Sequence, residues 1–198
     1  MQLRGLLEPV AAVAPVYIGM GNHDDRVNFV KAFADRPGRL AEVAGKHVTI
    51  IEHPAVRVVQ LDSLLYVDKV AGLLGREQRK WLAAYLDDAD ERPVALFVHH
   101  TLSDGDGDLL DVDRLFDILR PQRKVKALFY GHSHVWDIGE RDGVKLINLP
   151  AVGYNFRDED PVGWVDARFR RGGVELTLHT IGGNQSDNGK TTNVAWAR

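Results

Sequence analysis

The sequence contains no cysteine, which excludes disulfide bonds, thiolate nucleophiles and thiolate metal ligands. Any metal site must therefore be built from histidine, aspartate, glutamate or asparagine side chains. An excess of positive charge is also missing, because 25 Lys and Arg residues stand against 28 Asp and Glu residues, for a net charge of −3. Without a basic tract, we expect neither a nucleic acid nor an anionic membrane surface as a partner.

Long apolar runs are missing too. Residues 6–20 are largely apolar, but Glu8 and two prolines interrupt them, and the stretch is too short for a membrane span. We therefore expect no membrane partner and a cytoplasmic location. A chain of 198 residues suits one α/β domain. We place that domain at residues 1–181 and a flexible tail at residues 182–198, because Gly, Asn and Ser are frequent at the start of this tail.

Short apolar runs alternate with amphipathic segments, which is the pattern of strands and helices in an α/β sheet. The pattern predicts helices at residues 26–35, 77–88 and 109–119. It predicts strands at residues 15–20, 47–51, 56–61, 93–98 and 125–130. Three later segments with alternating apolar residues, at 144–149, 163–170 and 174–180, suggest antiparallel strands joined by turns.

Three polar clusters directly follow three of these predicted strands. They are Gly-Asn-His-Asp at residues 21–24, the pair at residues 99–100 and Gly-His-Ser-His at residues 131–134. In open α/β sheets, ligands bind where the carboxyl ends of the strands converge on one crevice. Because the three clusters also hold five of the eight histidines, we expect them to form one site.

The residue types in these clusters point to metal binding. His132 and His134 are two imidazoles separated by one residue, and imidazole suits Mn, Fe or Zn better than Mg or Ca. The alternative is a polar turn with two solvated histidines. Adjacent strand residues point to opposite faces, so only one of His99 and His100 should be a direct ligand. The alternative for this pair is one structural and one exposed histidine.

In the first cluster, the carboxylate of Asp24 could orient the ring of His23, fix its tautomer and raise its basicity. The alternative is an ordinary turn around Asn22. Taken singly, each cluster has such an alternative. Their common position after strands favours the metal site.

The order of the motifs resembles the second half of the calcineurin-like metallophosphoesterase signature, which reads Gly-Asn-His-Asp, then a strand ending in His, then Gly-His-x-His. The resemblance extends over residues 16–137. Leu61-Asp62-Ser63, residues 78–82 and residues 97–100 are further similar to the class III cyclic-nucleotide phosphodiesterase branch of that superfamily. The resemblance implies an α/β fold, a calcineurin-like β-sandwich with mixed sheets and flanking helices.

The resemblance also implies a site for two divalent transition-metal ions. Asn22, His99 and His132 would ligate one ion, and His134 would ligate the other. We expect Mn or Fe, with Zn or Ni as alternatives. The ligand in the family is usually the first histidine of His-His-Pro. This position favours His99 for the metal and leaves its neighbour as the open alternative, although a threonine stands here in place of the proline.

The chemistry that the resemblance implies is hydrolysis of a small phosphodiester, such as a cyclic nucleotide, by a metal-bound hydroxide. His23 would contact the phosphate and protonate the leaving oxygen, with Asp24 beside it. The products would be a phosphomonoester and an alcohol.

The family signature opens with Asp-x-His and Gly-Asp-x-x-Asp, and neither motif precedes Gly21. We therefore expect a chain that lacks the first strands of the family, as a truncated gene product or an internal-start fragment would. One ion would then keep only His134, and a half site should bind metal weakly. The alternative function is thus a catalytically inactive member of the fold that acts as a metal-binding or protein-interaction module. An exposed sheet edge would favour a homo-oligomer.

Overall fold

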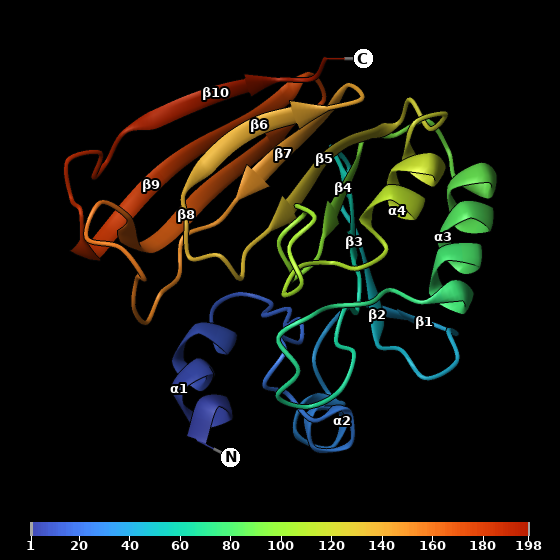
Figure 1. The fold of residues 1–198 in the computed structure, drawn as a ribbon, viewed down its shortest axis with the longest axis horizontal. Coiled ribbons are helices and arrows are strands. Elements are labelled where there is room, and N and C mark those ends of the chain that lie inside the picture. Colours follow the sequence, from blue (N-terminus) through green and yellow to red (C-terminus); the bar gives the residue numbers. More distant parts are fainter. Residues whose placement is uncertain (1, 198) are drawn as a thin grey trace.

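The computed structural model describes residues 2–197, which form four helices and two β-sheets (Figure 1). The helices are α1 (Gln2–Ala11), α2 (Arg26–Phe33), α3 (Arg76–Asp88) and α4 (Val112–Leu119). The first seven strands are β1 (Arg39–Ala41), β2 (Val48–Glu52), β3 (Arg57–Gln60), β4 (Val94–Phe97), β5 (Val125–Tyr130), β6 (Asp137–Arg141) and β7 (Val144–Asn148). The last three are β8 (Pro161–Arg170), β9 (Gly173–Gly183) and β10 (Thr191–Ala195). Within residues 2–197, no helix is long and apolar enough to span a bilayer.

The larger sheet has the strand order β1-β2-β3-β4-β5-β7-β6, and the smaller sheet has the order β10-β9-β8. Strands β3, β4, β5 and β7 run parallel to one another. Strands β2 and β6 run antiparallel to this centre, and β1 pairs antiparallel with β2 at the edge of the sheet. In Figure 1 the smaller sheet lies over one face of the larger sheet, and α3 and α4 cover the opposite face. The mixed, layered α/β fold that we predicted is confirmed.

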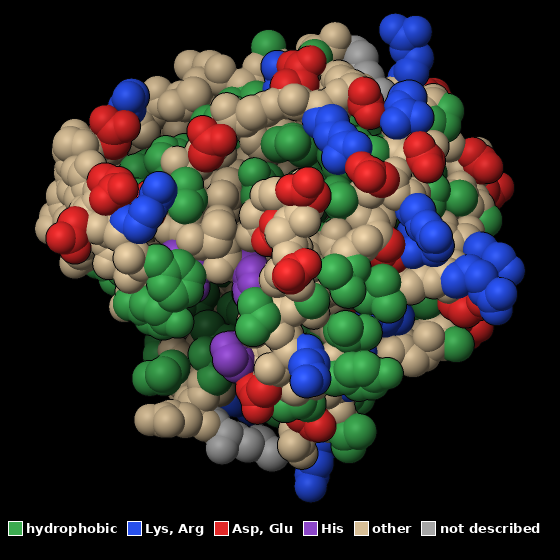
Figure 2. Space-filling model, viewed as in Figure 1, with side chains coloured by type: hydrophobic (Ala, Val, Ile, Leu, Met, Phe, Trp, Pro, Cys, Tyr) green, Lys and Arg blue, Asp and Glu red, His purple; other side chains and the backbone are tan. Residues whose placement is uncertain are grey.

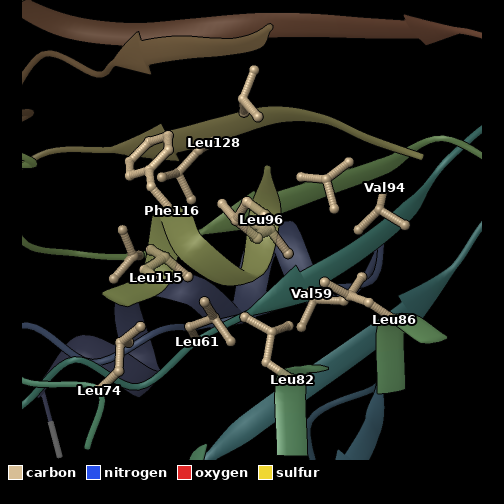
Figure 3. Close-up of a cluster of buried hydrophobic side chains, with 14 of the residues drawn as sticks. Val59, Leu61, Leu74, Leu82, Leu86, Val94, Leu96, Leu115, Phe116 and Leu128 are labelled. Carbon is tan, nitrogen blue, oxygen red and sulfur yellow. The ribbon is translucent and has the colours of Figure 1, made fainter. Parts of the chain in front are cut away.

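The core beneath the helices explains why α3 and α4 pack as they do. Leu82 and Leu86 of α3 are four residues apart, so they lie on one face of the helix. In Figure 3 this face meets Val59 and Leu96 of the sheet, and α4 adds Phe116. All of these side chains are fully buried. This packing fixes the parallel strands, and with them the loops at their carboxyl ends.

A second apolar cluster lies between the two sheets. Phe97 and Phe129 stack with their ring centroids 4.5 Å apart and face the smaller sheet. The smaller sheet contributes Val174, Leu176 and Val194. Because β10 supplies Val194 to this cluster, residues 191–195 are part of the folded sandwich. The prediction of a tail from residue 182 is wrong there, and its proposed boundary falls inside β9.

The predicted strand at residues 15–20 is also wrong, because the structure shows no strand there. The backbone of this segment forms hydrogen bonds with a side chain and not with a neighbouring strand. In the orientation that satisfies both partners, the amide nitrogen of Gln60 donates to Ile18 O at 3.0 Å and the amide oxygen accepts from Gly19 N at 2.8 Å. The segment still leads directly into the cluster at residues 21–24.

Candidate metal centre

The parallel strands β4 and β5 bring distant histidines to one edge of the larger sheet. His99 and His100 follow β4, and His132 and His134 lie just beyond β5. A hydrogen bond from Gly131 N to His99 O, at 3.0 Å, ties the two strand ends together. The prediction that these two clusters meet at the carboxyl ends of neighbouring strands is therefore confirmed.

Three of the predicted ligands place their side-chain heteroatoms close together. The Nε2 atom of His99 lies 3.1 Å from Asn22 Oδ1 and 3.2 Å from His132 Nδ1. This approach requires a residue without a side chain at Gly21, where a Cβ atom would lie 3.1 Å from the ring of His99. The glycine of the first cluster thus allows the asparagine beside it to reach the histidines.

These three residues suit a first-row transition-metal ion. Burial lowers the pKa of His99 to about 4, with neighbouring histidines lowering it further, and burial also lowers the pKa of His132. Both imidazoles are therefore neutral at neutral pH and keep a lone pair for a metal. Two atoms bound to one ion at about 2.0–2.1 Å lie roughly 3.0–3.4 Å apart. The separations around His99 Nε2 fall in that range.

His134, the ligand expected for a second ion, packs against aromatic side chains. Its ring stacks on Phe156 with centroids 4.3 Å apart and also contacts Tyr154 at 4.6 Å. Its Nδ1 atom is buried and has no hydrogen-bond partner within the described chain. His132 and His134 both have left-handed backbone conformations, with φ of 71° and 59°. Non-glycine residues rarely adopt this conformation, and those that do often lie at functional sites.

Within residues 2–197, the set of ligands for a second metal ion is incomplete. Over residues 2–197, no three His, Asp or Glu side chains are grouped so that they could hold a metal ion by themselves. An ion at the first position would thus depend on the neutral oxygen of Asn22 as well as on His99 and His132. Asn22, His99 and His132 can hold one ion. Within the described residues, His134 has no further ligands beside it to complete a second metal site.

His100 occupies a different environment from His99. Its ring is fully buried, and its Nδ1 atom lies 2.7 Å from the hydroxyl of Ser63. Burial lowers the pKa of His100 to about 3, with the charges of neighbouring histidines adding to the effect. The two rings are nearly perpendicular, at 84°. In this pair, His99 faces the other heteroatoms and His100 faces the interior.

His23 is paired with a carboxylate that the sequence pattern did not indicate. Its Nδ1 atom lies 2.7 Å from Asp68 Oδ1, and both side chains are exposed. The prediction that Asp24 orients this ring is wrong. The Asp24 carboxylate accepts a hydrogen bond from Gly21 N at 2.7 Å, because the turn at residues 21–24 leaves that amide in need of an acceptor. The loop of Asp68 is held against the same turn, with Asp68 N donating to Asn22 O at 2.8 Å.

A cavity of about 310 Å³ opens beside the histidines. His99, His132 and His134 line it together with apolar residues from Leu149 to Val152. Figure 2 shows histidines exposed on this face, with hydrophobic side chains gathered around them. Sequence reasoning did not find the apolar side of this cavity, because residues 149–160 have neither a periodic pattern nor a metal-ligand motif.

Comparisons with known proteins agree with this fold. The family model of calcineurin-like phosphoesterases matches residues 2–136. The chain is 28% identical to a 3′,5′-cyclic adenosine monophosphate phosphodiesterase from Haemophilus influenzae, over 85% of this chain and 61% of that protein. It is 31% identical to a probable glycerophosphodiester phosphodiesterase from Arcobacter nitrofigilis, over 61% of this chain and 45% of that protein.

A solved structure shares the architecture. A dimetal phosphatase from Danio rerio superimposes with a TM-score of 0.73, covering 96% of this chain and 75% of that chain at 14% sequence identity. The layered fold is thus that of metal-dependent phosphoesterases. The family model covers more than half of the sequence, so the chain belongs to the calcineurin-like phosphoesterase family. It spans 61% and 45% of the lengths of the two relatives named above.

Proposed function

We propose that this protein is a metal-dependent phosphodiesterase that hydrolyses small phosphodiesters, cyclic nucleotides among them. The observation that carries the proposal is the convergence of Asn22 Oδ1, His99 Nε2 and His132 Nδ1 within 3.1 and 3.2 Å. The relatives, which are named as phosphodiesterases, support the reaction class. Mn or Fe as the metal, with Zn or Ni as alternatives, and a cytoplasmic location stay predictions.

The chain's own residues have distinct parts in this proposal. When bound, divalent transition-metal ions polarise phosphoryl oxygens and make water available as a nucleophile. Asn22, His99 and His132 would hold one ion, and His134 would belong to a second. His23 would protonate the leaving oxygen through Nε2, because its Nδ1 atom is paired with the carboxylate of Asp68 at 2.7 Å, which orients the ring.

A second candidate function is a metal-binding or protein-interaction module without catalysis. The observation that favours it is the incomplete set of ligands. An ion here would depend on Asn22, and among residues 2–197 no carboxylate joins the three atoms around His99. A site with neutral ligands only would bind a divalent ion weakly and would not fix two ions at once.

Metal analysis combined with turnover separates the two candidates. We expect purified protein supplied with Mn to bind the metal and to hydrolyse bis-(p-nitrophenyl) phosphate. His23→Ala should lower turnover by roughly 10²- to 10⁴-fold, the contribution of a general acid, while the metal content stays unchanged. Asp68→Asn should lower turnover by a smaller factor. His53→Ala is the control, because His53 is exposed and lies outside the three clusters.

One outcome would contradict the phosphodiesterase, and another would contradict the role of His23. If the protein binds metal but does not hydrolyse the substrate, the function is that of the metal-binding or protein-interaction module. Turnover that is equal in the wild type and in His23→Ala would remove His23 from the reaction. Loss of metal in His99→Ala, with retention in His53→Ala, would identify the metal position in either case.

We also propose that the protein forms a homo-oligomer through α1. Leu3, Leu6 and Val10 of this helix are 53%, 70% and 50% exposed. The helix has no buried residue, and polar contacts such as the ion pair of Arg4 with Asp35, at 2.6 Å, hold it to the molecule. An apolar helix face open to water is stabilised when a second copy covers it.

A further inference from the structure

Two aromatic side chains beside the metal centre are exposed although the loop that carries them is well held. Phe156 and Tyr154 are 65% and 59% exposed. Exposed apolar side chains that lie together beside a cavity are a common feature of ligand-binding sites. Their position in an ordered loop, next to the histidines, points to a ligand that approaches from solvent.

The loop is held by polar contacts that centre on the buried residue Asp160. The Asn155 side-chain amide donates to the carbonyl oxygens of Arg157 and Asp160, at 2.7 and 2.9 Å. Arg157 Nε forms an ion pair with Asp160 at 2.8 Å, and Asp160 is buried. Asn184 N donates to Asp160 O at 3.1 Å and so connects the loop to the end of β9. The two aromatic rings are therefore presented from a fixed backbone.

The geometry of the rings places them at the rim of the metal centre. Phe156 is nearly parallel to the ring of His134, with an angle of 13° and centroids 4.3 Å apart. Tyr154 stands at 83° to Phe156, with centroids 5.5 Å apart. His134 also lines the 310 Å³ cavity that contains His99 and His132. A molecule whose phosphate lies at the histidines could thus extend its other end over Phe156.

The residues that line the cavity beside the histidines determine which chemical groups can bind there. In the part of the chain that the structure describes, no Lys, Arg, Asp or Glu lines this cavity. The wall from Leu149 to Val152 is apolar. A neutral, planar, aromatic group can stack on Phe156 and contact this wall.

We propose that Phe156 and Tyr154 form a stacking platform for the nucleobase of a nucleoside phosphate or phosphodiester. The inference rests on the proposed function and narrows its substrate class, because it favours nucleotides over glycerophosphodiesters. Phe156 supplies the stacking face, and Tyr154 closes the platform from the side.

Comparing the binding of two phosphates tests the platform apart from the metal. Adenosine 5′-monophosphate and ribose 5-phosphate differ only in the base, so the ratio of their dissociation constants in Zn-loaded protein reports the base alone. We expect the nucleotide to bind about tenfold more tightly, the size of base stacking on one aromatic side chain. Phe156→Ala should remove this preference and leave ribose 5-phosphate binding unchanged, and Phe156→Trp should keep it.

Trp164→Ala is the matched control. Trp164 is 50% exposed and stacks on His179 at 4.2 Å and 15°, in the same way as Phe156 stacks on His134. It lies in the smaller sheet, outside the cavity, so its removal should leave the preference intact.

Several outcomes would overturn the platform: equal affinity of the wild type for both phosphates, an equal loss of both in Phe156→Ala, or binding of glycerophosphocholine in place of the nucleotide. If neither phosphate binds, the metal site of the proposed function fails. Adenosine alone is then tested by saturation-transfer difference NMR. Base signals that disappear in Phe156→Ala support the platform, and signals that persist reject it.

Discussion

Lys46 is a buried cation whose charge the fold opposes. Its Nζ atom donates to the carbonyl oxygens of Leu64 and Leu73, at 2.9 and 2.7 Å. Burial lowers the pKa of Lys46 to about 8, and this effect outweighs the attraction of Asp62 at 3.8 Å. The unfolded chain, with a pKa near 10.5, therefore binds more protons than the folded chain between these two values.

The sign of the resulting pH dependence follows from proton linkage. Stability should rise as the pH increases from about 8 to 10.5, since the unfolded state holds the extra proton in this window. We expect the free energy of unfolding of the wild type, relative to Lys46→Met, to increase by on the order of 2–3 kcal/mol across the window. Urea unfolding of both proteins at several pH values measures the difference. A difference that stays flat would mean that Lys46 keeps its ordinary pKa.

At the scale of single residues, sequence reasoning found the histidines better than their partners. Asn22, His99 and His132 could be predicted because each follows a chain segment that ends at the same edge of the sheet. Asp68 could not, because it contacts His23 from 45 residues away, on a loop with no regular spacing. Asp24 was predicted to make this contact because proximity in sequence was taken for proximity in space.

At the scale of elements, Gly163 of β8 leaves no room for a side chain against the backbone of β9. A Cβ atom there would lie 2.0 Å from His179 O, which is backbone and cannot move aside. Gly163→Ala should therefore destabilise the smaller sheet by roughly 1–3 kcal/mol, the usual cost of overpacking. Gly139→Ala in β6 is the control, because no atom would lie within 4 Å of its Cβ. Equal urea midpoints for the two variants would show that β8 and β9 can move apart at Gly163 without loss of stability.

The elements that were missed have weak sequence signals for identifiable reasons. Strand β6 is largely exposed, so it has little apolar alternation. The Asp142-Gly143 turn between β6 and β7, with φ of 53° and 74°, was a usable hairpin signal. Strand β10 buries only Val194 among its five residues. Helix α1 was not predicted either. By contrast, α2, α3 and α4 and the strands β2, β3, β4, β5 and β7 of the larger sheet were predicted within a few residues.

At the scale of the whole molecule, the exposed face of α1 should decide the oligomeric state. Sedimentation velocity over a range of concentrations should show the wild type passing from one to two chains per particle. Leu6→Asp should keep it monomeric, because a charge in an apolar contact is costly to bury. Leu110→Asp is the control, since Leu110 is 56% exposed but lies outside α1. A wild type that stays monomeric throughout would reject the proposed interface.

The position of β10 also has a consequence for synthesis of the chain. The apolar cluster between the sheets joins Phe129 and Ile147 of the larger sheet to Val194 of β10. Domains begin to fold from their amino-terminal parts while the ribosome is still adding residues. The larger sheet can pair its strands early, but its inner apolar face is fully covered only after β10 has left the ribosome and joined β8 and β9. During that interval the nascent chain presents a surface that chaperones recognise.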